Sequence, residues 1–182
     1  MNYVYGVKSV EVLGTVHPDL KRRMLCVYEE LFSLHDVSMD AHSGLRCFSE
    51  QMKLWMKGRN ERGIVINPNE VVTKSRPGSS WHNYGLAVDS KFRGNDPYGV
   101  KMPDGTGAFL WSEYGRLCVK NGLTWGGDWN GNGIKDKNDF DRVHAECRYG
   151  MSLDEVKQIY DDGGLQGVFE SVDFLNKGGS YG

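Results

Sequence analysis

The sequence predicts an α+β fold, because helical and extended patterns both occur and do not alternate regularly along the chain. Residues 17–35 place apolar side chains at helical spacing, with a proline in the first turn. Residues 85–92, GLAVDSKF, alternate as a strand does. A doubly wound fold would need a repeated strand–helix–strand order, and its absence favours helices packed on a separate sheet.

The remaining elements are predicted from their boundary signals. Ser49 and Ser152 are suitable N-caps, and Gly58 and Gly122 lie where two helices should end. Gly, Pro, Asn and Ser are frequent in the stretches between, which predicts surface loops. The predicted helices are 49–59, 110–122 and 152–164, the further strand is 140–148, and the loops are 60–80 and 93–107.

Composition narrows the class of protein. The chain has 182 residues, 39% of them hydrophobic and 25% charged, which fits a single domain over residues 1–182. The net charge of -2 argues against a nucleic-acid partner, and no apolar run approaches the roughly 20 residues that span a bilayer. The N-terminus does not read as a secretory signal, so we expect synthesis in a cytoplasm, with free cysteines. Nothing demands more than a monomer.

The stretch SSWHNYGLAVDS, residues 79–90, holds two candidate metal ligands, His82 and Asp89. Catalytic zinc usually takes three protein ligands and leaves a fourth position to water. His144 in DFDRVHAE is a candidate third ligand, and Asp141, three residues earlier, could move a proton. Alternatively, these residues are structural members of a turn and two strands, and on spacing alone both interpretations stay open. The other histidines lack a partnering motif and are interpreted as structural: His17, His35 and His42.

These segments resemble the family of D-Ala-D-Ala carboxypeptidases and phage L-alanyl-D-glutamate peptidases, the VanY-like zinc peptidases. The family's SxHxxGxAxD motif is matched by Ser80, His82, Gly85, Ala87 and Asp89. Its second signature, an acidic residue three before a His and after Trp-Gly-Gly, is matched by TWGGDW followed by Asp141 and His144. An upstream segment is matched by Arg46, Gln51, Gly58 and Arg59, and TVHPDLKRRM is similar to the opening of the phage branch.

The resemblance covers roughly residues 9–165 and implies a Hedgehog/D-Ala-D-Ala-peptidase-like fold, a small antiparallel sheet with packed helices. It also implies a zinc-dependent peptidoglycan endopeptidase, a phage endolysin that cuts the L-alanyl–D-glutamate bond of the stem peptide. Such an enzyme would wait in the host cytoplasm and reach the wall after membrane permeabilisation. The implied roles are zinc binding by His82, Asp89 and His144 and acid/base catalysis by Asp141. Arg46 is implied as a second catalytic residue, which faces the substrate and helps zinc to stabilise the developing oxyanion. Ser80 and Gln51 are implied as substrate-binding residues. On sequence alone, a surface salt bridge is the less favoured alternative for Arg46.

Residues 128–139, DWNGNGIKDKND, form a longer segment than simple members of the family are expected to carry. The spacing fits an EF-hand-like calcium loop, although the closing residue is Asp rather than Glu and no helix precedes it directly. A solvated Asn/Gly/Asp turn is the alternative. Because the loop ends two residues before Asp141, we hypothesise that calcium orders the catalytic acid/base. The predicted calcium ligands are Asp128, Asn130, Asn132, Ile134, Asp136 and Asp139.

Two other functions remain open from the sequence. One is a D,D-carboxypeptidase with the same zinc centre, which would normally require export. The other is a calcium-dependent cell-wall-binding module whose zinc site is vestigial. Substitution of Asp141 separates an enzyme from a binding module, because only catalysis should then fail.

Overall fold

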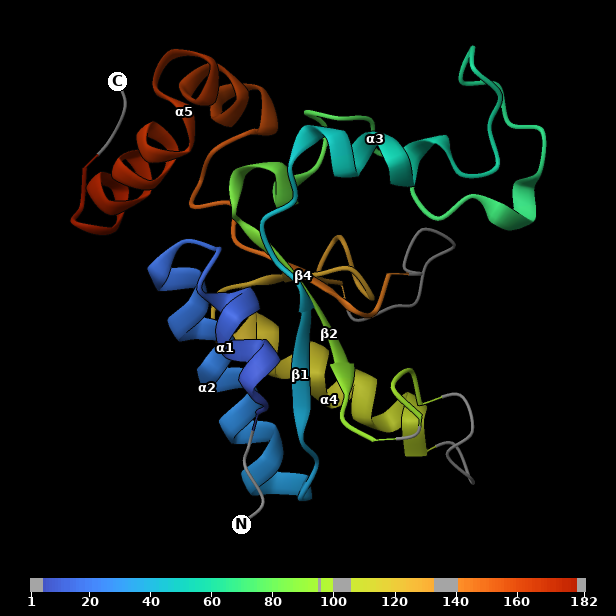
Figure 1. Ribbon diagram of the computed structural model, residues 1–182. Coiled ribbons are helices and arrows are strands. Elements are labelled where there is room, and N and C mark those ends of the chain that lie inside the picture. Colours follow the sequence, from blue (N-terminus) through green and yellow to red (C-terminus); the bar gives the residue numbers. More distant parts are fainter. Residues whose placement is uncertain (1–4, 95, 100–105, 133–140, 180–182) are drawn as a thin grey trace. The chain divides into compact units, whose positions relative to one another are not determined.

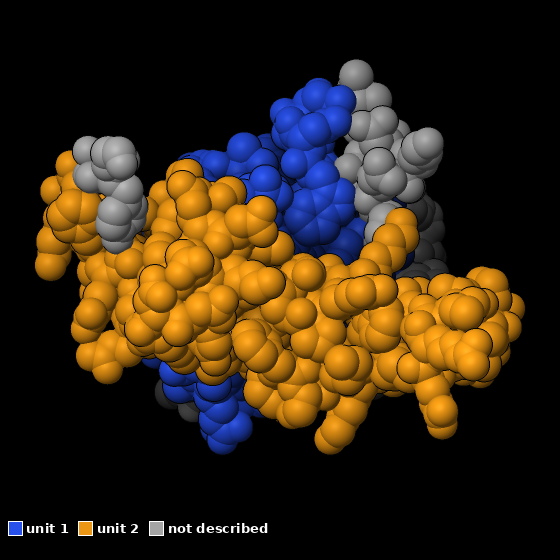
Figure 2. Space-filling model, turned by 90° about the horizontal axis from the view of Figure 1, so that it is seen from above, with its two compact units in different colours: residues 1–44, 86–148 blue, residues 45–85, 149–182 orange. Residues whose placement is uncertain are grey.

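The computed structural model describes residues 5–94, 96–99, 106–132 and 141–179. The chain divides into two compact units, coloured separately in Figure 2. Unit 1 comprises residues 1–44 and 86–148, and unit 2 comprises residues 45–85 and 149–182. The prediction of one catalytic domain over the whole chain stays a prediction. Among the described helices, none has both the length and the apolar character required to span a bilayer.

Unit 1 is built on an antiparallel sheet, which confirms the predicted α+β class (Figure 1). Within the described residues the strands lie in the order β1-β2-β4-β3, and both neighbours of β4 pair with it antiparallel. The strands are β1 (Met39–Ser43), β2 (Ala87–Phe92), β3 (Thr124–Trp125) and β4 (His144–Glu146). The helices of this unit are α1 (Val7–Leu13), α2 (Pro18–His35) and α4 (Thr106–Lys120).

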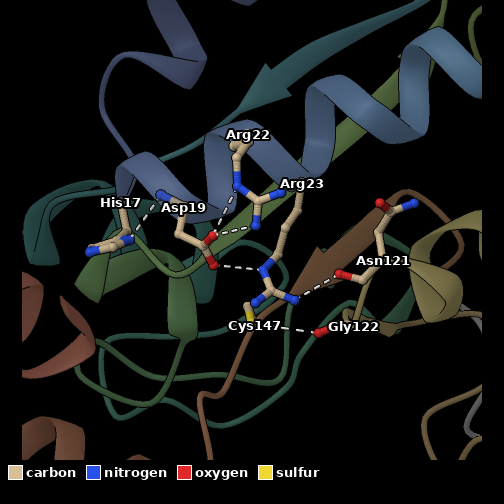
Figure 3. Close-up of polar contacts among 7 residues, drawn as sticks. All are labelled: His17, Asp19, Arg22, Arg23, Asn121, Gly122 and Cys147. Atoms are coloured by element: carbon tan, nitrogen blue, oxygen red, sulfur yellow. Dashed lines mark hydrogen bonds and ion pairs between the residues drawn. The ribbon is translucent and has the colours of Figure 1, made fainter. Parts of the chain in front are cut away.

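The start of α2 is fixed by a chain of polar contacts shown in Figure 3. His17 caps the helix, because its Nδ1 accepts a hydrogen bond from Asp19 N at 3.1 Å. The Asp19 carboxylate pairs with Arg22 and Arg23, each at 2.6 Å. Arg23 also donates to the carbonyl of Asn121, just beyond α4, at 2.8 Å. The structural role predicted for His17 is therefore confirmed.

The core of unit 1 contains a buried hydroxyl cluster that locks β2 to two helices. The Ser90 hydroxyl lies 2.7 Å from Tyr28 Oη on α2 and 2.9 Å from Tyr114 Oη on α4. Burial raises the pKa of the Tyr114 hydroxyl well above its ordinary value, so the cluster stays uncharged. Successive side chains of a strand point to opposite faces. Because Ser90 faces this core, its neighbour Asp89 faces away from it.

Unit 2 contains α3 (Phe48–Met56), the short 3₁₀ helices η1 (Pro68–Glu70) and η2 (Trp81–Tyr84), and α5 (Leu153–Asn176). Aromatic rings pack these elements together. The Tyr84 ring lies 6.4 Å from that of Phe48 and 5.4 Å from that of Tyr160, both in edge-to-face geometry. The contacts hold η2, which carries His82, against α3 and α5.

Several element boundaries differ from the predicted ones for identifiable reasons. Helix α3 begins one residue early: Cys47 is the N-cap, and its N–H donates to the Glu50 carboxylate at 3.0 Å. Ser152 does cap α5, as predicted, through a capping box with Glu155. However, α5 extends to Asn176, because Gly164 at φ +64° makes a kink there and the helix then resumes.

Candidate metal centre

The pairing of β2 with β4 brings two of the predicted ligands together. Asp89 and His144 are direct partners in the register. The His144 Nδ1 atom lies 3.2 Å from Asp89 Oδ1, with the His144 side chain 8% and the Asp89 side chain 17% exposed. A buried imidazole and a largely buried carboxylate thus share one face of the sheet.

His82, the third predicted ligand, lies on η2, shortly before β2 in the chain. Gly85 ends η2 in the left-handed conformation, at φ +67°. Strand β2, which carries Asp89, begins two residues later, so only a short connection separates His82 from that strand. His82 is buried, and its carbonyl accepts a hydrogen bond from Arg46 N at 2.9 Å. His82, Asp89 and His144 each offer one ligand atom, and these atoms all lie within 4.8 Å of one another. Among the described residues they form a possible metal site.

The electrostatics at His144 favour positive charge. Burial disfavours the charged imidazole, but hydrogen bonds and charge attraction from Asp89 and Glu146 outweigh it and raise the pKa of His144 to about 10. Burial also acts to raise the pKa of Glu146, yet hydrogen bonds from His144 and Arg148 hold it below its ordinary value. Two carboxylates therefore flank one imidazole, an arrangement that attracts a cation.

The donor set fits a zinc-type ion. Two imidazole nitrogens and one carboxylate oxygen are ligands that Zn²⁺ takes in catalytic sites, where one position stays open. A hard oxygen-only ion such as Ca²⁺ or Mg²⁺ would not select two imidazoles. The residues present therefore suit a borderline transition metal.

Asp141 is held next to His144 by the Trp-Gly-Gly segment. Gly126 N donates to His144 O at 2.9 Å, and Asp141 N donates to Gly126 O at 3.1 Å. His144 N donates in turn to Asp141 O at 3.0 Å, which closes a tight turn between them. A Cβ on Gly126 would lie 2.4 Å from Asp141 O, so only glycine permits this approach. The half-buried Asp141 is thereby fixed one turn from a candidate ligand.

Arg46 is oriented by a buried glutamine. Gln51 is fully buried, its Oε1 accepts from Arg46 Nη1 at 2.9 Å, and its Nε2 donates to Ser75 O at 2.8 Å. The predicted substrate contact by Gln51 stays a prediction, and the described contacts give it a role in orienting Arg46. Ser80 is the N-cap residue of η2 and is 9% exposed, and its predicted substrate contact also stays a prediction.

The first half of the predicted calcium loop lies beside the metal site. The backbone N–H of Asn132 donates to Asp128 Oδ1 at 3.1 Å and to Asn130 Oδ1 at 3.2 Å, which closes a turn at the exposed residues 130 to 132. Between Asp128 and Asn130 in the chain, the Trp129 ring packs 5.3 Å from the His144 ring, centroid to centroid. The other predicted calcium ligands lie outside the described residues: Ile134, Asp136 and Asp139.

Three residues that contact the candidate site residues were not predicted from the sequence. Asn83 joins two loops, because its Nδ2 donates to Arg46 O at 2.8 Å and its Oδ1 accepts from Gly78 N at 2.9 Å. Trp129 and Glu146 both contact His144. Glu146 could have been predicted, because it lies two residues after His144 on the expected strand and residues two apart on a strand share a face. No local signal marks Asn83 or Trp129, whose contacts arise from tertiary packing.

Comparison with known proteins places these residues within matched segments. Two family models, both described as D-alanyl-D-alanine carboxypeptidase, match residues 17–105 and residues 73–146. The second match contains the whole set of candidate metal and acid/base residues: His82, Asp89, Asp141 and His144.

Curated relatives and solved structures similar to the chain include the following three. The peptidoglycan L-alanyl-D-glutamate endopeptidase CwlK of Bacillus subtilis (strain 168) is 37% identical over 90 residues, which cover 47% of this chain and 50% of CwlK. The chain thus spans about half the length of this relative. The Serratia marcescens L-Ala D-Glu endopeptidase ChiX is 22% identical, with a TM-score of 0.47 over 80% of this chain and 90% of that one. The LD-carboxypeptidase LdcB is 18% identical, with a TM-score of 0.49 over 85% of this chain and 68% of that one.

Proposed function

We propose, since the chain belongs to the VanY-like family of D-alanyl-D-alanine carboxypeptidases, that it is a zinc-dependent peptidoglycan peptidase. The bond proposed to be cut is that between L-alanine and D-glutamate of the stem peptide. The similarity to a Bacillus subtilis endopeptidase named for this bond supports the choice. One structural observation carries the proposal: the ligand atoms of His82, Asp89 and His144 gather within 4.8 Å.

The three proposed ligands would hold zinc, and Asp141 would move the proton. Zinc at such a site supplies Lewis-acid activation of water and of the scissile carbonyl. The Asp141 carboxylate would accept a proton from the attacking water and return it to the leaving amine nitrogen. The turn that bonds Asp141 to His144 and Gly126 fixes the backbone from which this carboxylate extends, and a proton shuttle requires such a fixed position.

Arg46 is the proposed anchor for the substrate. Its guanidinium is a planar fork that pairs with carboxylates, and D-glutamate carries one. Its backbone N–H is bonded to His82 O, so the anchor is tied to a metal ligand. Gln51 orients the guanidinium, because its Oε1 accepts a hydrogen bond from Arg46 Nη1. One backbone hydrogen bond therefore links Arg46 to the candidate ligand His82, and a second, to Gln51, orients its side chain.

Regulation by calcium and the endolysin role are further parts of the proposal. The proposal of a calcium loop rests on the sequence pattern, and the oxygens of Asp128 and Asn130 converge on one backbone N–H in the described part of that loop. Trp129 gives the loop a contact with His144. The endolysin role rests on the similarity of TVHPDLKRRM to the phage branch. In that role the enzyme accumulates in the host cytoplasm and acts on the wall once the membrane is permeabilised.

The function is tested with the zinc-loaded full chain and its Asp141→Asn variant. We expect wild type to solubilise purified peptidoglycan, and Asp141→Asn to bind zinc and the wall without cutting it. The matched control is Asp162→Asn, an exposed aspartate of α5 that should retain full activity. Equal cleavage by Asp141→Asn would remove Asp141 from the mechanism.

The two alternative functions give different results in the same assay. A D,D-carboxypeptidase would release free D-alanine and leave the stem peptide otherwise intact. A wall-binding module would sediment with peptidoglycan and release no product, in wild type as in the variants. Either result would overturn the proposed endopeptidase.

A further inference from the structure

Glu146 is a buried carboxylate that the proposed mechanism does not use. It lies two residues after His144 on β4, so both side chains share one face of the strand. Its side chain is 3% exposed, and its Oε2 lies 2.9 Å from His144 Nε2. A glutamate is rarely buried to this degree unless paired groups compensate it, which makes its partners informative.

The contacts of Glu146 determine which nitrogen of His144 faces the metal site. An ionised carboxylate can only accept hydrogen bonds, so the Nε2 atom beside it carries the proton. Without a metal, Nδ1 also carries a proton, directed to Asp89. A metal ion would displace that proton and take the lone pair of Nδ1, while Glu146 keeps the proton on Nε2. Nδ1 is the atom 3.2 Å from Asp89 Oδ1, on the side of the other candidate ligands.

The position of Glu146 is itself rigid. Its backbone is paired on both sides, with Ala87 of β2 and with Thr124 of β3. Its second oxygen, Oε1, accepts from Arg148 Nε at 2.6 Å. A guanidinium therefore neutralises one oxygen, and the other is left to hold the imidazole.

We propose that Glu146 is a positioning residue for the metal centre, which fixes the His144 ring with Nδ1 toward the metal and raises the basicity of that nitrogen. Carboxylates that hold the far nitrogen of a metal-binding histidine contribute about 10–100-fold to metal affinity. The inference rests on the proposed zinc site, and it adds a residue that binds neither metal nor substrate. Its alternative is a purely structural ion pair between Glu146 and Arg148.

The structure contains a matched control for this triad. Glu113 also contacts one histidine and one arginine: its Oε2 lies 3.1 Å from His35 Nε2 and 3.0 Å from Arg116 Nη2. This second triad is more exposed and contains none of the candidate ligands. Glu113→Ala should therefore leave metal affinity unchanged, although it removes the same kind of contacts.

The test measures zinc affinity of the full chain by competition with a chromophoric chelator, beside the thermal midpoint of the metal-free protein. We expect Glu146→Ala to weaken zinc binding by about 10–100-fold. The zinc affinity of Glu146→Gln should lie between those of Glu146→Ala and wild type, because the uncharged amide oxygen can still accept a hydrogen bond from His144 Nε2. The visible spectrum of the cobalt-loaded protein should change in both variants and not in Glu113→Ala.

Two results would overturn the positioning role. One is wild-type zinc affinity in both Glu146 variants, with Glu146→Gln deciding the case if Glu146→Ala does not fold. The other is an equal loss of affinity in Arg148→Ala, which removes the ion pair and leaves the Glu146–His144 contact. A wild-type chain without zinc affinity would overturn the proposed function as well. If wild type binds zinc and cleaves peptidoglycan, and the Glu146 variants keep wild-type zinc affinity, the positioning role alone would be overturned.

Discussion

Asp89 and His144 face each other across the β2–β4 pair, with Asp89 Oδ1 and His144 Nδ1 3.2 Å apart. Strand register therefore brings together two of the three candidate metal ligands. A shift of one residue in either strand would send one of the two side chains to the opposite face. The hydroxyl cluster around Ser90 fixes β2, and pairing with β2 and β3 on both sides fixes β4, so the fold itself brings these two donors together.

Asp89→Asn should abolish tight metal binding while the protein stays folded. The amide keeps the shape of the side chain but loses the charge that a cation requires, so we expect affinity to fall by about 100-fold or more. Zinc content after dialysis against a weak chelator measures this directly. The exposed Asp162→Asn should keep its metal, and a fully loaded Asp89→Asn protein would contradict the assignment.

Gly126→Ala should reduce activity by displacing Asp141. The new Cβ would meet Asp141 O at 2.4 Å, so this backbone must move. A misplacement of about 1 Å at a catalytic group costs on the order of 100-fold in rate, and we expect kcat/KM to fall by 10–100-fold, roughly. The control is Gly163→Ala, where the space around an added Cβ is open. If Gly126→Ala matched that control, Asp141 would not depend on this turn.

Arg46→Lys should raise KM and leave zinc content unchanged. Lysine keeps the charge but loses the planar fork and cannot reproduce the contact with Gln51 Oε1 in the same geometry. We expect KM for stem-peptide substrates to rise about tenfold, the value of one lost charged contact. Arg22→Lys, at an exposed ion pair on α2, serves as the control. A fall in kcat with KM unchanged would move Arg46 from anchoring to the chemical step.

Asp40 should make the protein acid-sensitive. Burial acts to raise its pKa, but hydrogen bonds from Arg93, Gly6 and Ser9 outweigh it and lower the pKa to about 2 from 3.8. Because the folded pKa is depressed, its stabilisation is complete above pH 3.8 and is lost as the pH falls toward 2. Asp40→Asn should lower the free energy of unfolding by about 1–2 kcal/mol at pH 6 and by much less near pH 2.

Chemical denaturation of wild type and Asp40→Asn at several pH values tests this difference. Parallel curves for the two proteins from pH 6 to pH 2 would show that the ion pair with Arg93 contributes no pH-dependent stability.

Calcium binding should depend on Asp128 and should be visible through Trp129. This ring packs against His144, so we expect its fluorescence to change when calcium orders the loop. Asp128→Ala should abolish the change and, under the regulatory hypothesis, reduce activity to the level of the calcium-free wild type. Calorimetric titration of the zinc-loaded protein measures the affinity. Full activity in an Asp128→Ala protein that no longer binds calcium would refute regulation.

The sequence predicted the most periodic elements and missed those that tertiary pairing creates. The amphipathic pattern of residues 17–35 was sufficient to predict α2, and the alternation of residues 85–92 was sufficient to predict β2. Strand β1 reads MDAHS, which has little strand character, and is formed by pairing with β2. Gly163 and Gly164 looked like a helix end, yet Gly164 only kinks α5.

The candidate site could be predicted only in part, because sequence patterns indicate local spacing and not tertiary contacts. Short motifs carry the residues whose spacing is local, so His82 with Asp89, and Asp141 with His144, could be named in advance. The contacts that orient them join distant segments, as between Arg46 N and His82 O or between the rings of Trp129 and His144. Such contacts depend on the register of the sheet and the packing of unit 2, which local patterns do not encode.

The most direct measurement is mass spectrometry of the products released from purified peptidoglycan by the zinc-loaded protein. The proposed endopeptidase predicts stem peptides with a new N-terminal D-glutamate, absent with Asp141→Asn and with wild type stripped of zinc. Free D-alanine in place of those peptides, or no product while the protein stays bound to the wall, would contradict it.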